Sequence, residues 1–267
     1  MTSEAKNEFS NMLSKLQQER DQYYLYRYLD WRGFLFFITM RSLHCTRLDQ
    51  LEDAFEGRDI KRLLLLQRNK SLSLFKSIQP ENQDLLESIF NNEKEIEERR
   101  ESELLNPKRF FVNCWYRGKK ESPLMWKSFS DVSGITLKIP EETLPAIIKS
   151  FNYDEGKIKH QISKVKYVDM KNLNQHSYTD PEIISEFVPL YKDDAYLAEQ
   201  EVRIIYEVTE SNKILNFLEI NLDHHEVGKF HGIFHPKFPK WLKEPLREIT
   251  KRFHDNFKIV DSELDFR

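Results

Sequence analysis

The chain has 267 residues and a formal net charge of −3, with 39% hydrophobic and 32% charged residues. Aromatic residues at 13% are too many for a disordered chain, and the near-balanced charge is not that of a protein that coats nucleic acid or an anionic membrane. Only 7 glycines occur, none with the spacing of a Walker A loop or a GxGxxG turn, which argues against P-loop kinases, GTPases and Rossmann dehydrogenases.

In the first half of the chain, apolar spacing predicts a helix over 9–16, a strand over 23–29 and a buried segment over 33–38. The pattern becomes helical from 60 to 96, in two runs separated by Pro80. The second run leads into the mixed-charge stretch 93–103, which is typical of a solvated helix face.

The second half alternates between strands and short helices. Strands are predicted over 109–116, 135–139, 164–168 and 201–208. Helices are predicted over 141–151, from Asp180-Pro181 onward, and from Pro239 onward, where Pro245 either restarts or kinks the helix. The sequence therefore predicts one α+β domain over 1–267, with a mixed, mainly antiparallel sheet flanked by helices and a helical insertion at about 58–106.

The expected cellular location is based on the absence of a disulfide pattern, a signal peptide and a membrane-spanning segment in the sequence. Cys45 and Cys114 are far apart and form no CxxC pair, so neither a zinc ribbon nor a disulfide framework is indicated. The first residues lack the layout of a signal peptide, and the longest apolar runs, 34–40 and 63–66, are far shorter than the ~20 residues that span a bilayer. We expect a cytoplasmic protein with no membrane partner.

Several segments resemble one known family when they are taken in order. They are LYRYL at 25–29, LDQLEDAFEG at 48–57, NCWY at 113–116, ESPLMWKSFS at 121–130, GITL at 134–137, EQEVRIIYE at 199–207, FHPKFPKW at 234–241 and VDSEL at 260–264. This ordered set is similar to the bacterial domain-of-unknown-function 2971 family and covers about 25–265. Phe129 stands where that family more often has Tyr, and Ala54 where it usually has Pro. The resemblance implies domain boundaries and no mechanism.

The strongest local group of chemical side chains is Glu199-Gln-Glu201-Val-Arg203. Alternation along a strand places the two carboxylates and the guanidinium on one face, while Val202 and Ile204 line the other. One interpretation is a solvated sheet edge. The other is a catalytic site in which one carboxylate stabilises positive charge or takes a proton and Arg203 orients the carboxylates.

A second set of residues is predicted to bind substrate. Arg27, between Tyr26 and Tyr28, is either an edge residue stacked on tyrosine or an anion-binding group in a pocket with aromatic walls such as Tyr28. Trp126 fits core packing as well as a ligand wall. Ser128 and Ser130 could present hydroxyls to a ligand, although no GxSxG elbow surrounds either of them.

Metal chemistry is weakly indicated. The spacing His231-x-x-x-His235 would suit a zinc helix, but Gly232 and Pro236 argue against a helix there, and we expect no metal site. Asp53 and Glu56 form an acidic turn before Gly57, which is read as turn chemistry.

Three functions remain open. The first is an enzyme that acts on NAD with the logic of ADP-ribosyltransferases, because Arg27, Ser128 or Ser130, and Glu201 follow one another in the order of a pyrophosphate-binding arginine, a hydroxyl and a catalytic glutamate. The second is a nuclease or nucleic-acid-binding effector, in which Arg27, Lys119, Lys120, Lys127 and the acidic turn form a phosphate-contacting groove with a metal-binding carboxylate pair. The third is a non-catalytic module in which the insertion at 58–106 recognises a protein partner.

Overall fold

The computed structural model describes residues 22–52, 107–149, 158–169, 190–208 and 215–265. The predicted helices over 9–16 and after Asp180-Pro181, the insertion at 58–106 and the acidic turn at Asp53 and Glu56 lie outside these residues.

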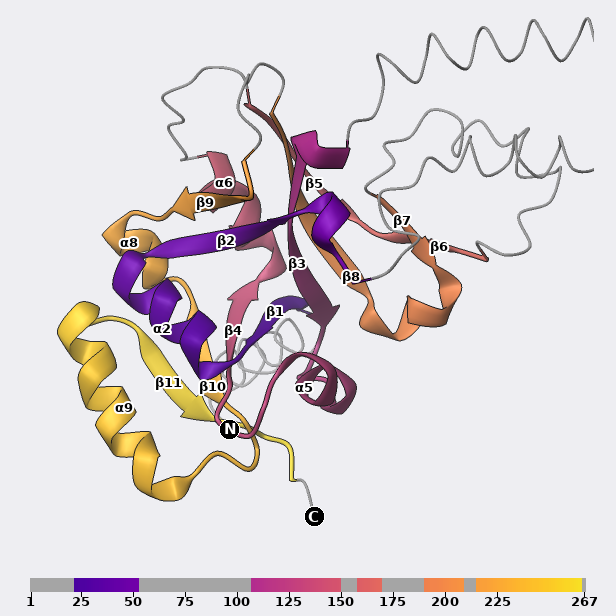
Figure 1. Ribbon diagram of the computed structural model, residues 1–267. Coiled ribbons are helices and arrows are strands. Elements are labelled where there is room, and N and C mark those ends of the chain that lie inside the picture. The colour runs from indigo at the N-terminus through magenta and orange to yellow at the C-terminus, as the bar shows by residue number, and fades with distance from the viewer. Residues whose placement is uncertain (1–21, 53–106, 150–157, 170–189, 209–214, 266–267) are drawn as a thin grey trace, which may run out of the picture.

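Within the described ranges, nine strands form one sheet (Figure 1). They are β1 (Tyr24–Leu29), β2 (Ser42–Arg47), β3 (Phe110–Gly118), β4 (Ile135–Pro140), β5 (Ile158–Lys164), β8 (Glu201–Val208), β9 (Phe217–Asn221), β10 (His231–Phe234) and β11 (Lys258–Asp261). Their order is β11-β10-β4-β1-β3-β2-β9, and β8 lies between β3 and β5. The pair β10–β11 is parallel and the other pairs are antiparallel, which confirms the predicted α+β class with a mixed, mainly antiparallel sheet.

Strand β3 changes partners along one of its edges, and this change shapes the sheet. Along this edge, β3 pairs with β2 at Phe111 and Val112 and with β1 from Tyr116 to Gly118. Its other edge pairs with β8 along most of its length. The sheet therefore forks between β1 and β2, and backbone groups of β3 between the two ladders need other partners.

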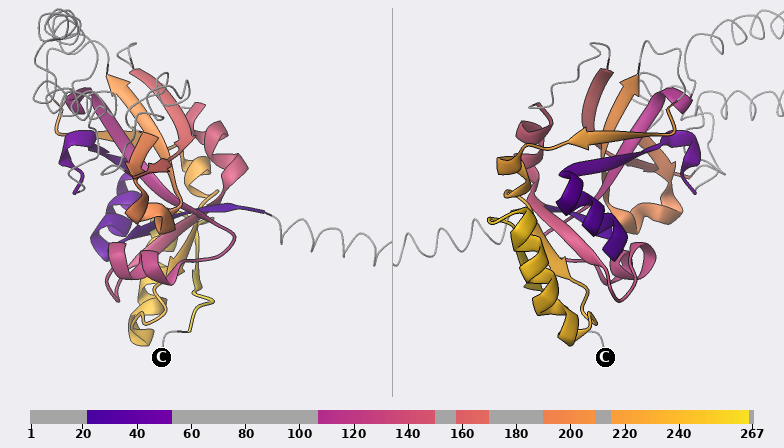
Figure 2. Two further views of the ribbon diagram at one scale, coloured as in Figure 1. Left: turned by 90° about the vertical axis from the view of Figure 1, so that its right-hand side faces the viewer. Right: turned by 60° about the vertical axis from the view of Figure 1, so that its left-hand side comes forward.

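The helices divide between the two faces of the sheet. The larger core contains side chains from α2 (Trp31–Met40), α6 (Leu144–Lys149) and α8 (His224–Val227), and Leu242 and Leu246 of α9 (Lys240–Phe253) pack against it. The other face is covered by α5 (Pro123–Phe129), whose Met125 and Trp126 pack on Tyr26 and Tyr28. Figure 2 shows α9 beside β11, where Arg247 donates a hydrogen bond to the Ile259 carbonyl (3.1 Å).

Two local predictions are sharpened by the structure. The buried segment over 33–38 is part of α2, which begins after Asp30 because the Asp30 side chain accepts a hydrogen bond from the Gly33 amide (2.7 Å). The last helix runs without interruption from Lys240 to Phe253 with Pro245 inside it, so it does not restart there.

The predicted strand over 164–168 is divided between two sheets. Lys164 ends β5, and Lys166 begins β6 (Lys166–Val168). Strand β6 pairs in parallel with β7 (Tyr191–Asp193) as a separate two-stranded sheet. None of the helices in the described ranges has the length and apolar character required to cross a membrane.

Candidate functional site

A tight chain reversal brings acidic and basic side chains together at the start of β8. After β7 the chain forms the 3-10 helix η7 (Asp194–Glu199), and Gln200 then takes a left-handed conformation with φ 40°. A non-glycine residue rarely adopts a positive φ, so this reversal is well determined by its surroundings. It places Glu199, Glu201 and Lys192 next to one another.

Four charged side chains form a buried network, which we call the β8 charge cluster: Lys192, Glu199, Glu201 and Arg203. Lys192 Nζ lies 2.6 Å from Glu199 Oε2 and 3.5 Å from Glu201 Oε2. Arg203 donates from Nε to Glu201 Oε1 (2.8 Å) and from its Nη2 to Glu201 Oε2 (3.0 Å). Side-chain exposure is 1% for Arg203, 5% for Glu201, 8% for Lys192 and 14% for Glu199. The interpretation as a solvated edge is therefore wrong for these side chains.

The backbone of Glu201 is fixed as well. Its amide donates to the Tyr167 hydroxyl (2.8 Å), and its carbonyl accepts from the Val165 amide (2.8 Å). Both partners come from the segment around β6, which thus holds the first residue of β8 in place. The carboxylates are therefore held in place by Lys192 of β7, by the segment around β6 and by Arg203 of β8.

The charge state of Glu201 follows from this environment. Burial by itself would raise the pKa of this carboxyl, but Arg203, then Lys192 and a hydrogen bond from Cys114, lower it to about 2. Glu201 is therefore an ionised carboxylate at all physiological pH values. Such a group is suited to stabilise positive charge and is poorly suited to take up a proton.

This low pKa predicts how stability depends on pH. A carboxyl whose pKa falls from 4.5 to about 2 on folding adds stability that is fully present above 4.5 and disappears as the pH falls towards 2. We expect the difference in urea midpoint between the wild-type chain and Glu201→Gln to be constant from pH 7 to about pH 5 and to shrink towards pH 3. A difference that stays constant over the whole range would contradict the assignment.

Arg27, predicted to bind substrate, lies at the fork of the sheet. Its guanidinium donates to the carbonyls of Cys114 on β3 and His44 on β2, both at 3.1 Å. The Asn113 side chain also donates to the His44 carbonyl (2.8 Å). Arg27 thus supplies hydrogen bonds at the place where β3 changes partners, and burial lowers its pKa from the ordinary value.

Tyr28 and Trp126, also predicted to bind substrate, pack against each other. Their ring centroids are 4.9 Å apart in an edge-to-face arrangement. The Tyr28 hydroxyl accepts from the Ser122 amide (2.7 Å), and Trp126 Nε1 donates to Glu121 Oε2 (2.9 Å). Trp126 is fully buried, so it anchors α5 on the sheet.

The two serines differ in their surroundings. Ser128 is exposed on α5, whereas Ser130 ends that helix and donates from Oγ to the carbonyls of Leu29 (3.2 Å) and Asp131 (3.1 Å). A Cβ at Gly134 would lie 1.7 Å from Ser130 Oγ and 2.5 Å from the Leu29 carbonyl, so this contact requires glycine. Ser130 therefore joins α5 to the end of β1.

The structure gathers the predicted site residues into separate groups. Glu199, Glu201 and Arg203 come together in the β8 charge cluster. Tyr28 and Trp126 form a second group on the same face of the sheet, because Tyr116 is the strand partner of both Glu201 and Tyr26. Arg27 alternates with these tyrosines along β1 and lies at the fork, where burial lowers its pKa and Glu201 lies near enough for its charge to raise that pKa to a smaller extent.

Sequence reasoning missed Lys192, Tyr167 and Glu121. Lys192 and Tyr167 lie in segments without a motif, and Glu121 opens the motif at 121–130, but each meets its partner only through the fold. Of the residues behind the nuclease hypothesis, Lys119 and Lys120 are exposed between β3 and α5, Lys127 is exposed on α5, and the acidic turn lies outside the described ranges.

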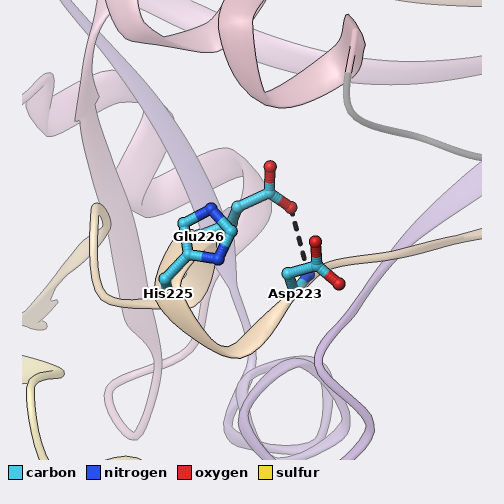
Figure 3. Close-up of side chains that lie close together, drawn as sticks. All are labelled: Asp223, His225 and Glu226. Atoms are coloured by element: carbon cyan, nitrogen blue, oxygen red, sulfur yellow. Dashed lines mark hydrogen bonds between the residues drawn. The ribbon is translucent and has the colours of Figure 1, made fainter.

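No metal site was expected from the sequence, but one group in the described ranges has side chains that could hold a metal ion. Asp223, His225 and Glu226 have ligand atoms within 4.8 Å of one another (Figure 3). Glu226 Oε2 accepts from the Asp223 amide (3.0 Å), and Asp223 caps α8 in return, so both carboxylates already serve the helix start. His231 lies in β10, and the zinc helix that its spacing to His235 would suit is not formed.

No protein-family model, curated protein or solved structure matches this chain. The resemblance to the 2971 family therefore stays a prediction, and the function proposed below is based on the geometry of the site.

Proposed function

We propose that this chain is a nucleotide-processing enzyme that acts on NAD, with Glu201 as the carboxylate beside the reacting ribose. The proposal is based on one observation: at the start of β8, Glu199 and Glu201 both lie next to the ammonium group of Lys192. This arrangement holds one carboxylate buried and ionised and leaves the other nearer to solvent. It supplies the two acidic roles that transfer at a glycosidic carbon needs.

In the proposed step, the bond between ribose C1′ and the nicotinamide nitrogen breaks. Nicotinamide leaves as a neutral molecule with the bonding electron pair, and positive charge develops on the ribose ring. The ionised Glu201 stabilises that charge through space. Water, or a nucleophilic group of an acceptor, then adds to C1′ and gives up a proton. We assign that proton to Glu199, because it is the more exposed carboxylate of the pair and therefore the one nearer to solvent.

Two features of the site favour this division of roles. Arg203 and Tyr167 fix the side chain and the backbone of Glu201, which gives the preorganisation that electrostatic stabilisation requires. The partly exposed Tyr116 is the strand partner of Glu201 and lies on the same face of the sheet, where it offers a surface on which a planar ring of a nucleotide can stack.

The test is nicotinamide release from NAD by the full-length chain and three variants. Glu201→Gln should lower the rate at least about 100-fold, because the amide keeps the shape and loses the charge. Glu199→Gln should lower it less and shift the acid limb of the pH–rate profile. The control Glu248→Gln, which changes an exposed pair with Lys251 on α9, should have the wild-type rate.

Folding must be measured in parallel because Glu201 is buried. Thermal melting and circular dichroism of each variant separate a folded, inactive protein from an unfolded one. Unchanged release by a folded Glu201→Gln chain would remove Glu201 from the mechanism. Absence of release by the folded wild-type chain would remove the proposed activity.

A further inference from the structure

A wall of tyrosines adjoins the β8 charge cluster. Tyr24, Tyr26 and Tyr28 of β1 and Tyr116 of β3 share one face of the sheet, with neighbouring ring centroids 6.0–6.4 Å apart. We call these four residues the tyrosine wall. Tyr24 and Tyr116 are partly exposed, whereas Tyr26 and Tyr28 are buried. Tyr116 is directly opposite Glu201 in the β3–β8 ladder, so the wall extends to the cluster.

A short segment that follows β11 covers part of this wall. In this segment, residues 262–265, which we call the strap, Leu264 packs against the buried cluster to which Tyr24 and Tyr116 also pack, namely Tyr26, Tyr28, Met125, Trp126 and Ile233. Figure 1 shows this part of the chain leaving β11 and passing below α5. The strap is separated by more than 120 residues of sequence from the strands that it covers, so this contact is made by the tertiary fold.

Glu121 holds the strap in place. Its carboxylate accepts hydrogen bonds from Ser262 Oγ (2.8 Å) and from the Glu263 amide (3.1 Å). The same carboxylate accepts from Trp126 Nε1 (2.9 Å), so one acidic group joins the strap to α5. No strand ladder secures the strap among the described residues, and its attachment rests on these two hydrogen bonds and on Leu264.

A cation lies under the strap. Lys138 Nζ is 3.9 Å from the centroid of the Tyr24 ring and 5.8 Å from that of Tyr26. Burial lowers the pKa of Lys138, while Glu263 of the strap and Glu121 act in the opposite direction. The strap thus adds an apolar side chain to the aromatic cluster and a negative charge that acts on Lys138.

We propose that the tyrosine wall with Lys138 is a nucleotide subsite and that the strap occupies it as an internal substitute, with Leu264 in place of the base and Glu263 in place of a phosphate. Aromatic rings bind bases by stacking, and a lysine binds phosphate as a point charge. A nucleotide can enter only when the strap leaves, so the strap lowers the apparent affinity of the subsite. The proposal that the ligand is a nucleotide rests on the proposed function. The observation that the strap covers the wall is independent of the proposed function.

The test compares binding of ADP to the full-length chain and to Ser262→Ala/Leu264→Ala, by titration calorimetry. The double variant removes one of the two hydrogen bonds and the apolar contact of the strap, and it should bind ADP about tenfold more tightly. A matched control, Ser133→Ala/Leu35→Ala, makes the same chemical changes on a turn and on α2 and should bind like the wild-type chain.

A second variant addresses the phosphate. In the double-variant background, Lys138→Met should weaken ADP binding several-fold and leave the binding of adenosine nearly unchanged. Equal losses for both ligands would overturn the assignment of Lys138 to a phosphate.

Hydrogen exchange at the Glu263 amide shows whether the strap has been loosened. Faster exchange there without tighter ADP binding would overturn the inference, and so would the absence of ADP binding in every variant. Nicotinamide release is scored separately. Tighter ADP binding without release keeps the subsite and removes the proposed activity, whereas release that does not respond to the strap variants keeps the activity and removes the substitute role.

Discussion

Replacing Arg203 by methionine is expected to destabilise the protein by about 3–5 kcal/mol, because the ionised Glu201 then stays buried without its bidentate partner. Lys192 alone, at 3.5 Å from Glu201 Oε2, cannot replace the two hydrogen bonds of Arg203. The measurement is the free energy of unfolding from urea denaturation at pH 7. Arg32→Met, which removes a largely exposed ion pair with Asp30, is the control and should cost less than about 1 kcal/mol.

A double-mutant cycle shows whether the loss comes from the unpaired charge. Glu201→Gln in the Arg203→Met background removes the stranded carboxylate and should recover part of the lost stability. A double variant that is destabilised by the sum of the two single effects would contradict the pairing described here.

Arg27→Met should be the second large effect, with a loss of about 1–3 kcal/mol, the cost of leaving one carbonyl without its donor. The methionine removes the guanidinium donor from the Cys114 carbonyl, whereas the His44 carbonyl keeps its hydrogen bond from the Asn113 side chain. The check is again urea denaturation, with Arg32→Met as the control because Arg32 is largely exposed and pairs only with Asp30 among its acidic neighbours in the described ranges.

Arg27→Lys separates the structural role from pyrophosphate binding. Lysine keeps the charge but lacks the planar fork that spans two carbonyls, so stability should fall almost as far as in the methionine variant. If Arg27 served mainly as an anion-binding charge, the lysine variant would keep the stability of the wild-type chain and lose affinity for NAD.

Local patterns in the sequence predicted β1, β3, β4 and β8, but they missed β2, β9, β10 and β11 and all of β5 except its last residue. The alternation in 135–139 and 201–208 predicted β4 and β8, because a strand with one face in the core repeats every two residues. The same rule could not tell that the face carrying Glu201 and Arg203 is covered too. That cover comes from β6, β7 and η7, whose packing on β8 depends on contacts between distant segments.

The candidate site was only partly predictable for the same reason. Strand alternation was expected to bring Glu199 and Glu201 together, but Glu199 belongs to η7 and not to β8. The two carboxylates meet through the left-handed turn at Gln200 and the ammonium group of Lys192. A turn of this kind has no glycine to signal it. The contact between Glu121 and the strap joins residues 141 positions apart, which no local pattern encodes.

The most direct test of the account is the release of nicotinamide when the purified full-length chain is incubated with NAD at neutral pH. The account predicts release that rises in proportion to protein concentration and that a folded Glu201→Gln chain does not produce. No release above the uncatalysed rate from a folded wild-type chain, or equal release from the Glu201→Gln chain, would contradict it.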